Sequence, residues 1–247
     1  MDLKKRFGQH FLKDENYLRR MAEVVKSNDI ILEIGPGGGA LTKHLVKAKR
    51  VIAIEKDRRF AQLNRELEFK NLEVIEGDFL NINLDNLGAT KVVANIPYYI
   101  TTPIIKKLLL ADGIEEIFLT IQKEVAERIV AKPSTKSYGL LTLLIKYYGN
   151  AKVIFNIPKG AFNPPPKVES SFIHISKKKK YIFEFEKFFK CAKLLFGTRR
   201  KTILKNLSGT YEREKVVEAL DHLKLDQNLR AENLTLEEIA KISEAIF

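Results

Sequence analysis

Cysteine is nearly absent from the 247-residue sequence, which contains only Cys191. A single cysteine excludes an intrachain disulfide, and it also excludes a zinc site built from several cysteines. The four histidines (His10, His44, His174 and His222) lie far apart in the sequence and do not have the spacing of metal ligands. We therefore expect no metal site in this protein.

Long apolar runs are missing as well. No stretch approaches the roughly 18 consecutive apolar residues of a membrane-spanning helix. The N-terminus does not show the charged and then apolar pattern of a secretory signal peptide. We therefore expect a cytoplasmic protein that does not associate with a membrane.

Negative charge is scarce relative to positive charge. The chain has 43 Lys and Arg against 31 Asp and Glu, which gives a formal net charge of +12. The excess is concentrated in residues 151–215, where 16 basic residues face 5 acidic ones, whereas residues 216–247 are net acidic. Such clustering favours a polyanionic partner, and nucleic acid in particular, over a surface that is merely soluble.

Short β-branched runs alternate with helical patterns in the first half of the chain. The segment from Lys4 to Leu12 is basic and is expected to be a loop. The runs typical of strands are Ile30–Ile34, Val51–Glu55, Leu72–Ile75, Val92–Asn95 and Ile117–Ile121. Helical patterns cover residues 15–26, 40–48, 57–67, 101–110 and 123–131. This alternation predicts a mostly parallel sheet with helices on both faces.

The pattern changes after a helical stretch at residues 138–148. Two strand-like runs, Lys152–Asn156 and Ser170–Ser176, flank a proline-rich loop and favour an antiparallel edge. Beyond a lysine run at 177–180 only helical patterns follow, at 184–196, 200–207, 213–221 and 235–246. We therefore predict an α/β domain over residues 1–180 and a small all-helical domain over residues 181–247.

A glycine-rich turn follows the first strand and runs from Gly35 to Ala40. Such a turn between a strand and a helix lets the backbone approach a nucleotide-like ligand. Glu55 ends the second strand, where its carboxylate can accept hydrogen bonds from both hydroxyls of a ribose. These features alone fit NAD and S-adenosylmethionine equally well.

Two further acids distinguish between these cofactors. Glu33 precedes the turn by two residues, where a carboxylate can face the sulfonium and amino groups of S-adenosylmethionine. Asp78 follows the third strand and can accept a hydrogen bond from the cofactor's adenine amine. Each acid could instead cap a helix. Their joint occurrence after consecutive strands favours S-adenosylmethionine.

The fourth strand ends in the sequence Asn95-Ile96-Pro97-Tyr98. An exocyclic aromatic amine is a poor nucleophile, so its methylation depends on acceptors that orient its N–H groups. The Asn95 side chain and the Ile96 backbone each offer a carbonyl, Pro97 makes the turn rigid, and Tyr98 offers a face for base stacking. The alternative is an ordinary strand that runs into a proline turn beside a core tyrosine.

This segment resembles the catalytic motif of adenine-N6 methyltransferases of nucleic acids. Further motifs are similar to the KsgA-type (RsmA/KsgA) ribosomal RNA small-subunit adenine dimethyltransferase family almost from end to end. They are Phe7-Gly8-Gln9-His10-Phe11-Leu12, Glu33–Gly39, Glu55-Lys56-Asp57, Gly77-Asp78-Phe79, Gln122–Ala126, Phe162–Ser170 and Phe196–Thr202.

The resemblance implies a Rossmann-like class I S-adenosylmethionine methyltransferase domain. It also implies dimethylation of two adjacent adenosines in the 3′-terminal hairpin loop of small-subunit rRNA, within an assembling 30S-type particle. Phe162 is implied to cover the second face of a base flipped onto Tyr98. The resemblance implies cofactor contacts at His10, Leu12, Gly35, Glu55, Asp78 and Asn95. We add Gln9, Glu33, Gly37, Lys56 and Phe79, from the same motifs, as further candidates for cofactor binding. Many family members have Asn where this chain has His10. A backbone contact does not depend on that difference, whereas a side-chain contact does.

Basic residues near the helical domain are candidates for phosphate contacts. We place these contacts at Arg199, Arg200 and Lys201, and also at Lys167, with Lys4, Lys5 and Arg6 as a further candidate surface. The lysine run at 177–180 fits a solvated linker equally well. We expect a monomer without an obligate protein partner.

Three other functions remain open. A methyltransferase that confers antibiotic resistance by acting on large-subunit rRNA would share the fold and the catalytic motif. A non-catalytic ribosome assembly factor would keep the fold without needing the acids and Asn95. An NAD-dependent oxidoreductase is supported only by the glycine turn.

Overall fold

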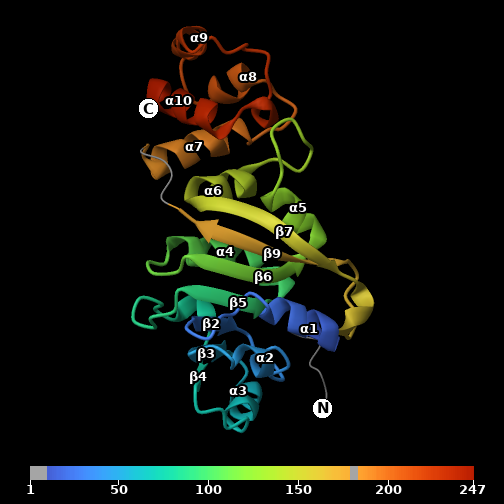
Figure 1. The fold of residues 1–247 in the computed structure, drawn as a ribbon. Helices are drawn as coiled ribbons and strands as arrows, with labels where there is room; N and C mark the ends of the chain where they lie inside the picture. Colours follow the sequence, from blue (N-terminus) through green and yellow to red (C-terminus); the bar gives the residue numbers. More distant parts are fainter. Residues whose placement is uncertain (1–9, 179–182) are drawn as a thin grey trace. The chain divides into compact units, whose positions relative to one another are not determined.

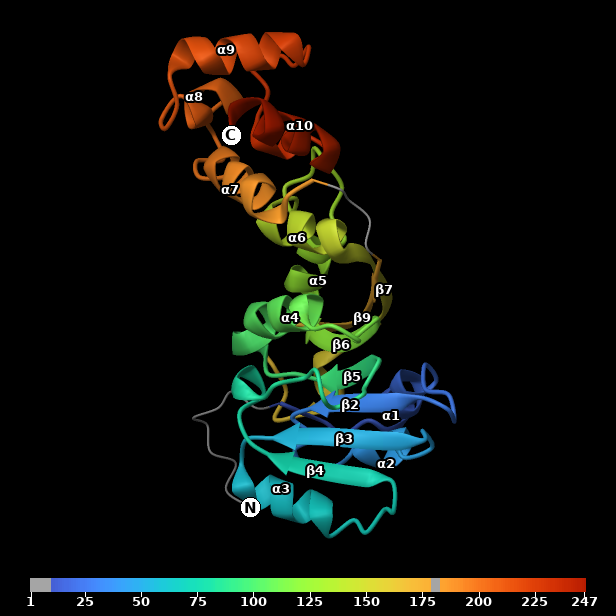
Figure 2. The same cartoon turned by 90° about the vertical axis from the view of Figure 1, so that its left-hand side faces the viewer.

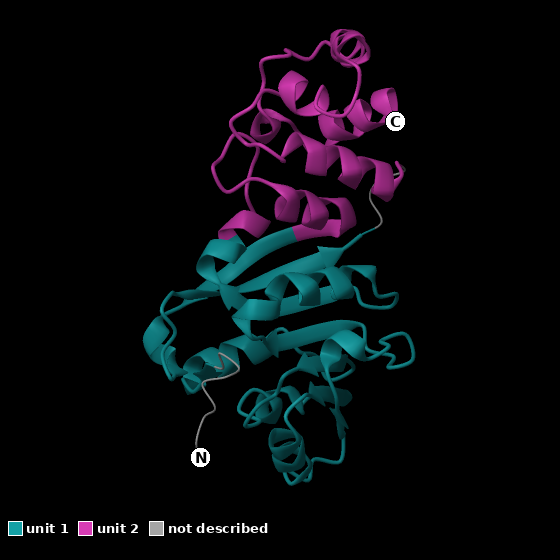
Figure 3. Cartoon of the chain, turned by 180° about the vertical axis from the view of Figure 1, so that it is seen from behind, with its two compact units in different colours: residues 1–126, 151–178 teal, residues 127–150, 179–247 magenta. Residues whose placement is uncertain are grey.

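The computed structural model describes residues 10–178 and 183–247, which form two compact units (Figures 1 and 3). Unit 1 consists of residues 1–126 and 151–178, and unit 2 of residues 127–150 and 179–247. The predicted boundary at residue 180 differs from this division, because residues 127–150 belong with the C-terminal helices. Tyr138 and Leu143, both fully buried, are part of the same apolar core as Phe188 and Ile239.

Unit 1 contains a sheet of seven strands in the order β4, β3, β2, β5, β6, β9 and β7. Their bounds are β4 (Leu72–Glu76), β3 (Arg50–Glu55), β2 (Ile30–Ile34), β5 (Lys91–Asn95), β6 (Glu116–Gln122), β9 (Ser170–Lys177) and β7 (Gly149–Ile157). The first five are parallel, and β9 pairs antiparallel with β6. Figure 2 shows β2, β3 and β4 side by side and pointing the same way. The predicted parallel sheet and its antiparallel edge are confirmed.

The central strands β2, β3 and β5 are buried almost along their whole length. This burial agrees with their continuous Val and Ile runs, which suit a strand covered on both faces. On one face, Leu18 and Met21 of α1 (Glu15–Ala22) pack in one apolar cluster with Val93 and Phe118. The other helices of this unit are α2 (Thr42–Leu45), α3 (Arg58–Arg65), α4 (Thr101–Leu110) and the start of α5 (Lys123–Ile129).

Two local predictions need correction. The helix expected at 40–48 is only Thr42–Leu45, because the backbone up to Gly39 forms the glycine turn, with a left-handed φ of +76° at Gly39. The expected N-terminal loop contains a short strand, β1 (Phe11–Leu12), which pairs antiparallel with β8 (Phe162–Asn163). This pairing joins the N-terminal segment to the proline-rich loop.

Unit 2 is helical, as predicted for the C-terminal part. It contains α6 (Leu140–Tyr148), α7 (Phe185–Leu195), α8 (Ile203–Leu207), α9 (Arg213–His222) and α10 (Leu236–Ile246). Their apolar faces enclose one core that includes the single cysteine. Helix α10 begins at a capping box, because Thr235 and Glu238 each accept a hydrogen bond from the other's backbone N–H. None of the described helices has the length and apolar character needed to cross a membrane.

Candidate active site

The candidate site lies at the carboxyl ends of the parallel strands, where the strand order reverses. The chain proceeds from β2 outward to β3 and β4, then returns to place β5 on the other side of β2. A reversal of this kind leaves a crevice outside the strand ends, which is where ligands bind in open α/β sheets. All four acidic and amide candidates lie at or just beyond the carboxyl ends of these strands: Glu33, Glu55, Asp78 and Asn95.

The glycine turn after β2 has backbone angles that other residues rarely adopt. Gly35 and Gly37 have φ values of +66° and +53°. A Cβ on Gly37 would lie 2.6 Å from Cε1 of Phe11, so the position has no room for a side chain. The turn therefore lies directly against β1, and its Gly37 N–H points to the end of β3.

The Glu55 carboxylate accepts a hydrogen bond from the Gly37 N–H and so links the glycine turn to the end of β3. Its two carboxylate oxygens accept hydrogen bonds from Gly37 N at 3.0 Å and from Asp57 N at 2.8 Å. Burial raises the pKa of Glu55, and these backbone donors oppose the increase. Each oxygen has a further lone pair, so the carboxylate can still accept from a ligand's hydroxyls.

Glu33 is the most deeply buried acid of the site, with only 1% of its surface exposed. Burial raises its pKa to about 8, and the negative charge of Glu55 adds to the increase. Its Oε2 atom has no hydrogen-bond partner among the residues that the structure describes. A buried, unpaired carboxylate oxygen is costly by itself and fits a ligand that brings a positive charge or an N–H group.

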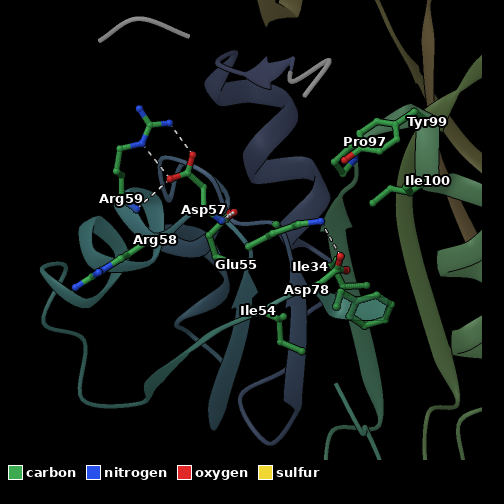
Figure 4. A pocket seen from close by; sticks show the side chains of 14 residues that line it. Ile34, Ile54, Glu55, Asp57, Arg58, Arg59, Asp78, Pro97, Tyr99 and Ile100 are labelled. Atoms are coloured by element: carbon green, nitrogen blue, oxygen red, sulfur yellow. Dashed lines mark hydrogen bonds and ion pairs between the residues drawn. The ribbon is translucent and has the colours of Figure 1, made fainter. Parts of the chain in front are cut away.

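An open cavity of about 430 Å³ lies between Glu55, Asp78 and the start of the η3 turn (Tyr98–Ile100). Asp78 accepts from Lys56 Nζ at 2.7 Å and from the backbone N–H of Leu80 at 3.0 Å. The bond from Lys56 is the main reason that the pKa of Asp78 is lowered. Figure 4 shows Glu55 and Asp78 on the sheet side of this cavity, with Pro97 and Tyr99 across from them.

The end of β5 presents an amide oxygen that the described part of the chain leaves free. Asn95 Nδ2 donates to the backbone carbonyl of His10 at 3.3 Å, whereas no described donor reaches Oδ1. Among the next residues, Ile96 is buried and Pro97 lines the cavity. The structure therefore brings the free Asn95 carbonyl to the same strand ends as the acids.

Tyr98 is held by contacts at its ring and at its hydroxyl. Its hydroxyl hydrogen-bonds the hydroxyl of Ser170, and its ring stacks on the His10 imidazole with centroids 5.8 Å apart. Burial raises the pKa of Tyr98, so the hydroxyl stays protonated. His10 Nδ1 donates to the carbonyl of Pro164 at 2.8 Å.

A second cavity, of about 640 Å³, lies on the other side of the glycine turn. It is lined by Leu12, Glu33, Asn95 and Asn163, among others. Phe162, expected to stack on a base, is only 1% exposed and packs in the core beside Leu12. Neither of its faces is open to a base in this structure, so stacking there would require it to leave the core.

The residues expected to contact RNA differ in the contacts that their side chains make within the structure. Lys167, Arg200 and Lys201 are exposed. Arg199 is exposed as well, but its guanidinium forms an ion pair with Glu232 at 2.8 Å and donates to the carbonyls of residues 136 and 138. Lys4, Lys5 and Arg6, also expected to contact RNA, lie outside the described part of the chain, as does Gln9, which was expected to contact the cofactor.

Sequence reasoning missed two residues of this site. Tyr99 is 62% exposed and lines the cavity, although its only signal in the sequence was its position after Tyr98. Ser170 belongs to a motif that matched the family, but nothing in the pattern showed that it contacts Tyr98. No cluster of three or more potential metal ligands occurs within residues 10–178 and 183–247.

The whole chain, residues 1–247, matches the family described as ribosomal RNA adenine dimethylase. The ribosomal RNA small subunit methyltransferase A of Fusobacterium nucleatum is 43% identical, over 97% of this chain and 96% of the relative. A solved dimethyladenosine transferase from Plasmodium falciparum is 30% identical with a TM-score of 0.82, over 94% and 96% of the two chains. The 23S rRNA methyltransferase ErmE is 28% identical with a TM-score of 0.74, over 96% and 99%.

Proposed function

The chain belongs to the ribosomal RNA adenine dimethylase family, and we propose that it dimethylates the N6 amines of two adjacent adenosines in the 3′-terminal hairpin loop of small-subunit rRNA. It is an rRNA adenine dimethyltransferase. The observation that carries the chemical part of the proposal is the carbonyl of Asn95, which no donor in the described part of the chain reaches and which is held at the strand ends beside Tyr98.

The acids at the strand ends fit S-adenosylmethionine, which when bound supplies an electrophilic methyl group. Glu55 would accept from the ribose hydroxyls, and Asp78, with Lys56 and Phe79 beside it, would hold the adenine. Glu33 offers the unpaired oxygen that a positively charged group can satisfy. Gly35 has open space where a Cβ would stand, so the backbone there can approach a ligand closely.

Asn95 orients the reacting amine. Because Nδ2 is committed to the His10 carbonyl, Oδ1 has a fixed direction and can accept one N–H of the target adenine. The backbone carbonyl of Ile96 is the candidate acceptor for the other N–H. With both N–H groups held, the nitrogen lone pair is turned out of the ring plane and toward the incoming methyl group.

Tyr98 supplies a flat surface for the adenine after it has left its stack in the RNA. Its hydroxyl is bonded to Ser170 and remains protonated, so it has no role as a base in this arrangement. The exposed Lys167, Arg200 and Lys201 would contact phosphates, which position the RNA without reading its sequence.

The test is methylation of separated ribosomal subunits. Unmethylated small and large subunits are incubated with the protein and S-adenosylmethionine, and nucleosides from each rRNA are measured by mass spectrometry. We expect N6,N6-dimethyladenosine in the small-subunit rRNA only, and none with Asn95→Ala. Dimethyladenosine confined to the large subunit would refute the proposed substrate.

A large-subunit substrate is the second candidate, because the chain shares 28% identity with ErmE over nearly its whole length. The higher identity to a small subunit methyltransferase favours the first candidate. The same experiment separates the two.

We also propose that the substrate is an assembling 30S-type particle and that the protein acts as a monomer. Naked rRNA, immature particles and mature small subunits would be compared at equal concentration. We expect the immature particle to be methylated fastest. Light scattering on the purified protein would report the mass of one chain.

A further inference from the structure

Ser170 is a buried polar residue that the proposed chemistry does not use directly. It begins β9 and is fully buried, opposite Gln122 of β6 in the antiparallel register. Its hydroxyl meets the hydroxyl of Tyr98, 72 residues away in the sequence. The start of β9, where Ser170 lies, is held by two hydrogen bonds of the preceding residue, Glu169. The Glu169 backbone carbonyl accepts from the Lys123 backbone N–H at 3.0 Å, and the Glu169 carboxylate accepts from Lys123 Nζ at 2.8 Å.

The hydroxyl of Tyr98 is unexpected for a residue whose role is stacking. A phenylalanine offers an equally good face to a base, so the ring alone does not require an oxygen. The Tyr98 backbone is already fixed, because it follows Pro97 and its carbonyl accepts from Thr101 Oγ1 at 3.0 Å. The remaining freedom is rotation of the side chain. Because Oη swings with rotation about the Cα–Cβ bond, its hydrogen bond to Ser170 fixes where the ring lies, and the stacked His10 imidazole limits rotation of the ring about Cβ–Cγ.

We propose that Ser170 is a positioning residue that fixes the position of the Tyr98 ring, and that this determines how completely the adenine amine is dimethylated. The proposal rests on the function proposed above. Before the first transfer the amine has two N–H groups, one for Asn95 Oδ1 and one for the Ile96 carbonyl. Before the second transfer only one N–H is left, so the orientation of the base depends more on the stacking surface. A loosened Tyr98 ring should therefore slow the second methylation more than the first.

The structure offers a matched control in the next residue. Ser171 is also buried, in the same strand, and its hydroxyl donates to Asn156 Oδ1 at 2.8 Å instead of contacting Tyr98. Ser170→Ala and Ser171→Ala therefore each remove one buried hydroxyl and one hydrogen bond from β9. Only the first removes the hydrogen bond to Tyr98.

The experiment measures single-turnover methylation of small-subunit rRNA at saturating S-adenosylmethionine, with unmodified, mono- and dimethyladenosine quantified over time. We expect Ser170→Ala to lower the rate of the second transfer by roughly 3- to 10-fold, which is the effect expected when one ordered side chain becomes free to move. Monomethyladenosine should then accumulate. Cofactor affinity should stay within about twofold. Ser171→Ala should keep the parental product ratio.

A double-mutant cycle with Tyr98→Phe shows whether Ser170 acts through the hydroxyl. Tyr98→Phe keeps the ring but loses the bond, so the double variant should be no slower than either single variant. Ser170→Thr, which keeps a hydroxyl, should restore dimethylation. A parental product ratio in Ser170→Ala, or fully additive effects with Tyr98→Phe, overturns the inference. If the parental protein itself forms no dimethyladenosine, the proposed function is refuted instead.

Discussion

The replacement Glu33→Gln should change how the stability of the protein depends on pH. Glu33 is fully buried, and its pKa is about 8 in the folded protein against 4.5 for an ordinary glutamate. Between these pH values the unfolded chain has released the proton and the folded protein still holds it. The free energy of unfolding therefore falls as pH rises through this window and levels off above about pH 8.

The magnitude follows from the two pKa values. At about 1.4 kcal/mol per pH unit, the difference between 4.5 and about 8 corresponds to about 5 kcal/mol of stability lost between pH 4 and pH 9. Glutamine has the same shape and no titratable proton. We therefore expect the variant to match the parental protein near pH 5 and to exceed it in stability at pH 8.

Urea unfolding followed by circular dichroism at several pH values between 5 and 9 measures this difference. Glu23→Gln is the control, because Glu23 is an exposed acid of the same unit and its replacement also removes one carboxyl group. Calorimetric titration with S-adenosylmethionine in buffers of different ionisation enthalpy should show proton release near pH 7 in the parental protein only. Parallel stability profiles for the parental protein and Glu33→Gln would refute the reasoning.

Four further predictions concern other residues of the chain. Glu55→Ala should weaken cofactor binding by about 1–3 kcal/mol in calorimetry, with RNA affinity retained, because a charged acceptor is lost. An unchanged cofactor affinity would mean that Glu55 only stabilises the glycine turn and does not contact the cofactor. Asn95→Ala should abolish turnover while folding and cofactor binding remain, and a parental rate of dimethylation would show that the catalytic strand end is elsewhere. Charge reversal at Arg200 and Lys201 should lower RNA affinity and flatten its dependence on log salt by about one unit per lost phosphate contact. Reversal at Arg199 should also lower the stability of unit 2, because it breaks the ion pair with Glu232.

The central sheet could be predicted from the sequence because its strands carry a strong local signal. Buried parallel strands need apolar residues on both faces, so the Ile and Val runs of β2, β3 and β5 are recognisable one at a time. The pairing of β1 with β8 could not be predicted in this way. It involves two residues on each strand, separated by about 150 positions, and two residues show no periodicity.

The sequence was enough to predict which residues belong to the candidate site, but not which contacts they make with one another. Because Glu33, Glu55, Asp78 and Asn95 stand at or just beyond the ends of successive strands, the parallel sheet brings them to one edge. The sequence could not show that the Asn95 amide is turned by the His10 carbonyl, because this depends on where the N-terminal segment lies. The burial of Phe162 likewise results from the β1–β8 pairing.

Arg199 shows the limit of arguments from charge. Three consecutive basic residues beside an aromatic residue suggest a phosphate-binding surface. In the structure the first of them binds Glu232 and two backbone carbonyls of its own unit. A count of basic residues cannot separate a side chain that stabilises the fold from one that is available to RNA.

The discontinuous composition of unit 2 has a consequence for synthesis of the protein. Helix α6 is synthesised before the other helices of this core, and the last of them, α10, ends about 100 residues later. At a synthesis rate of about 5–20 residues per second, the apolar side chains of α6 lack their final packing partners for about 5–20 s. A nascent chain that has reached Lys178 has every strand of the sheet but still lacks the helices that cover Leu143. During that interval the incomplete core is a surface on which chaperones can bind and on which misfolding can begin.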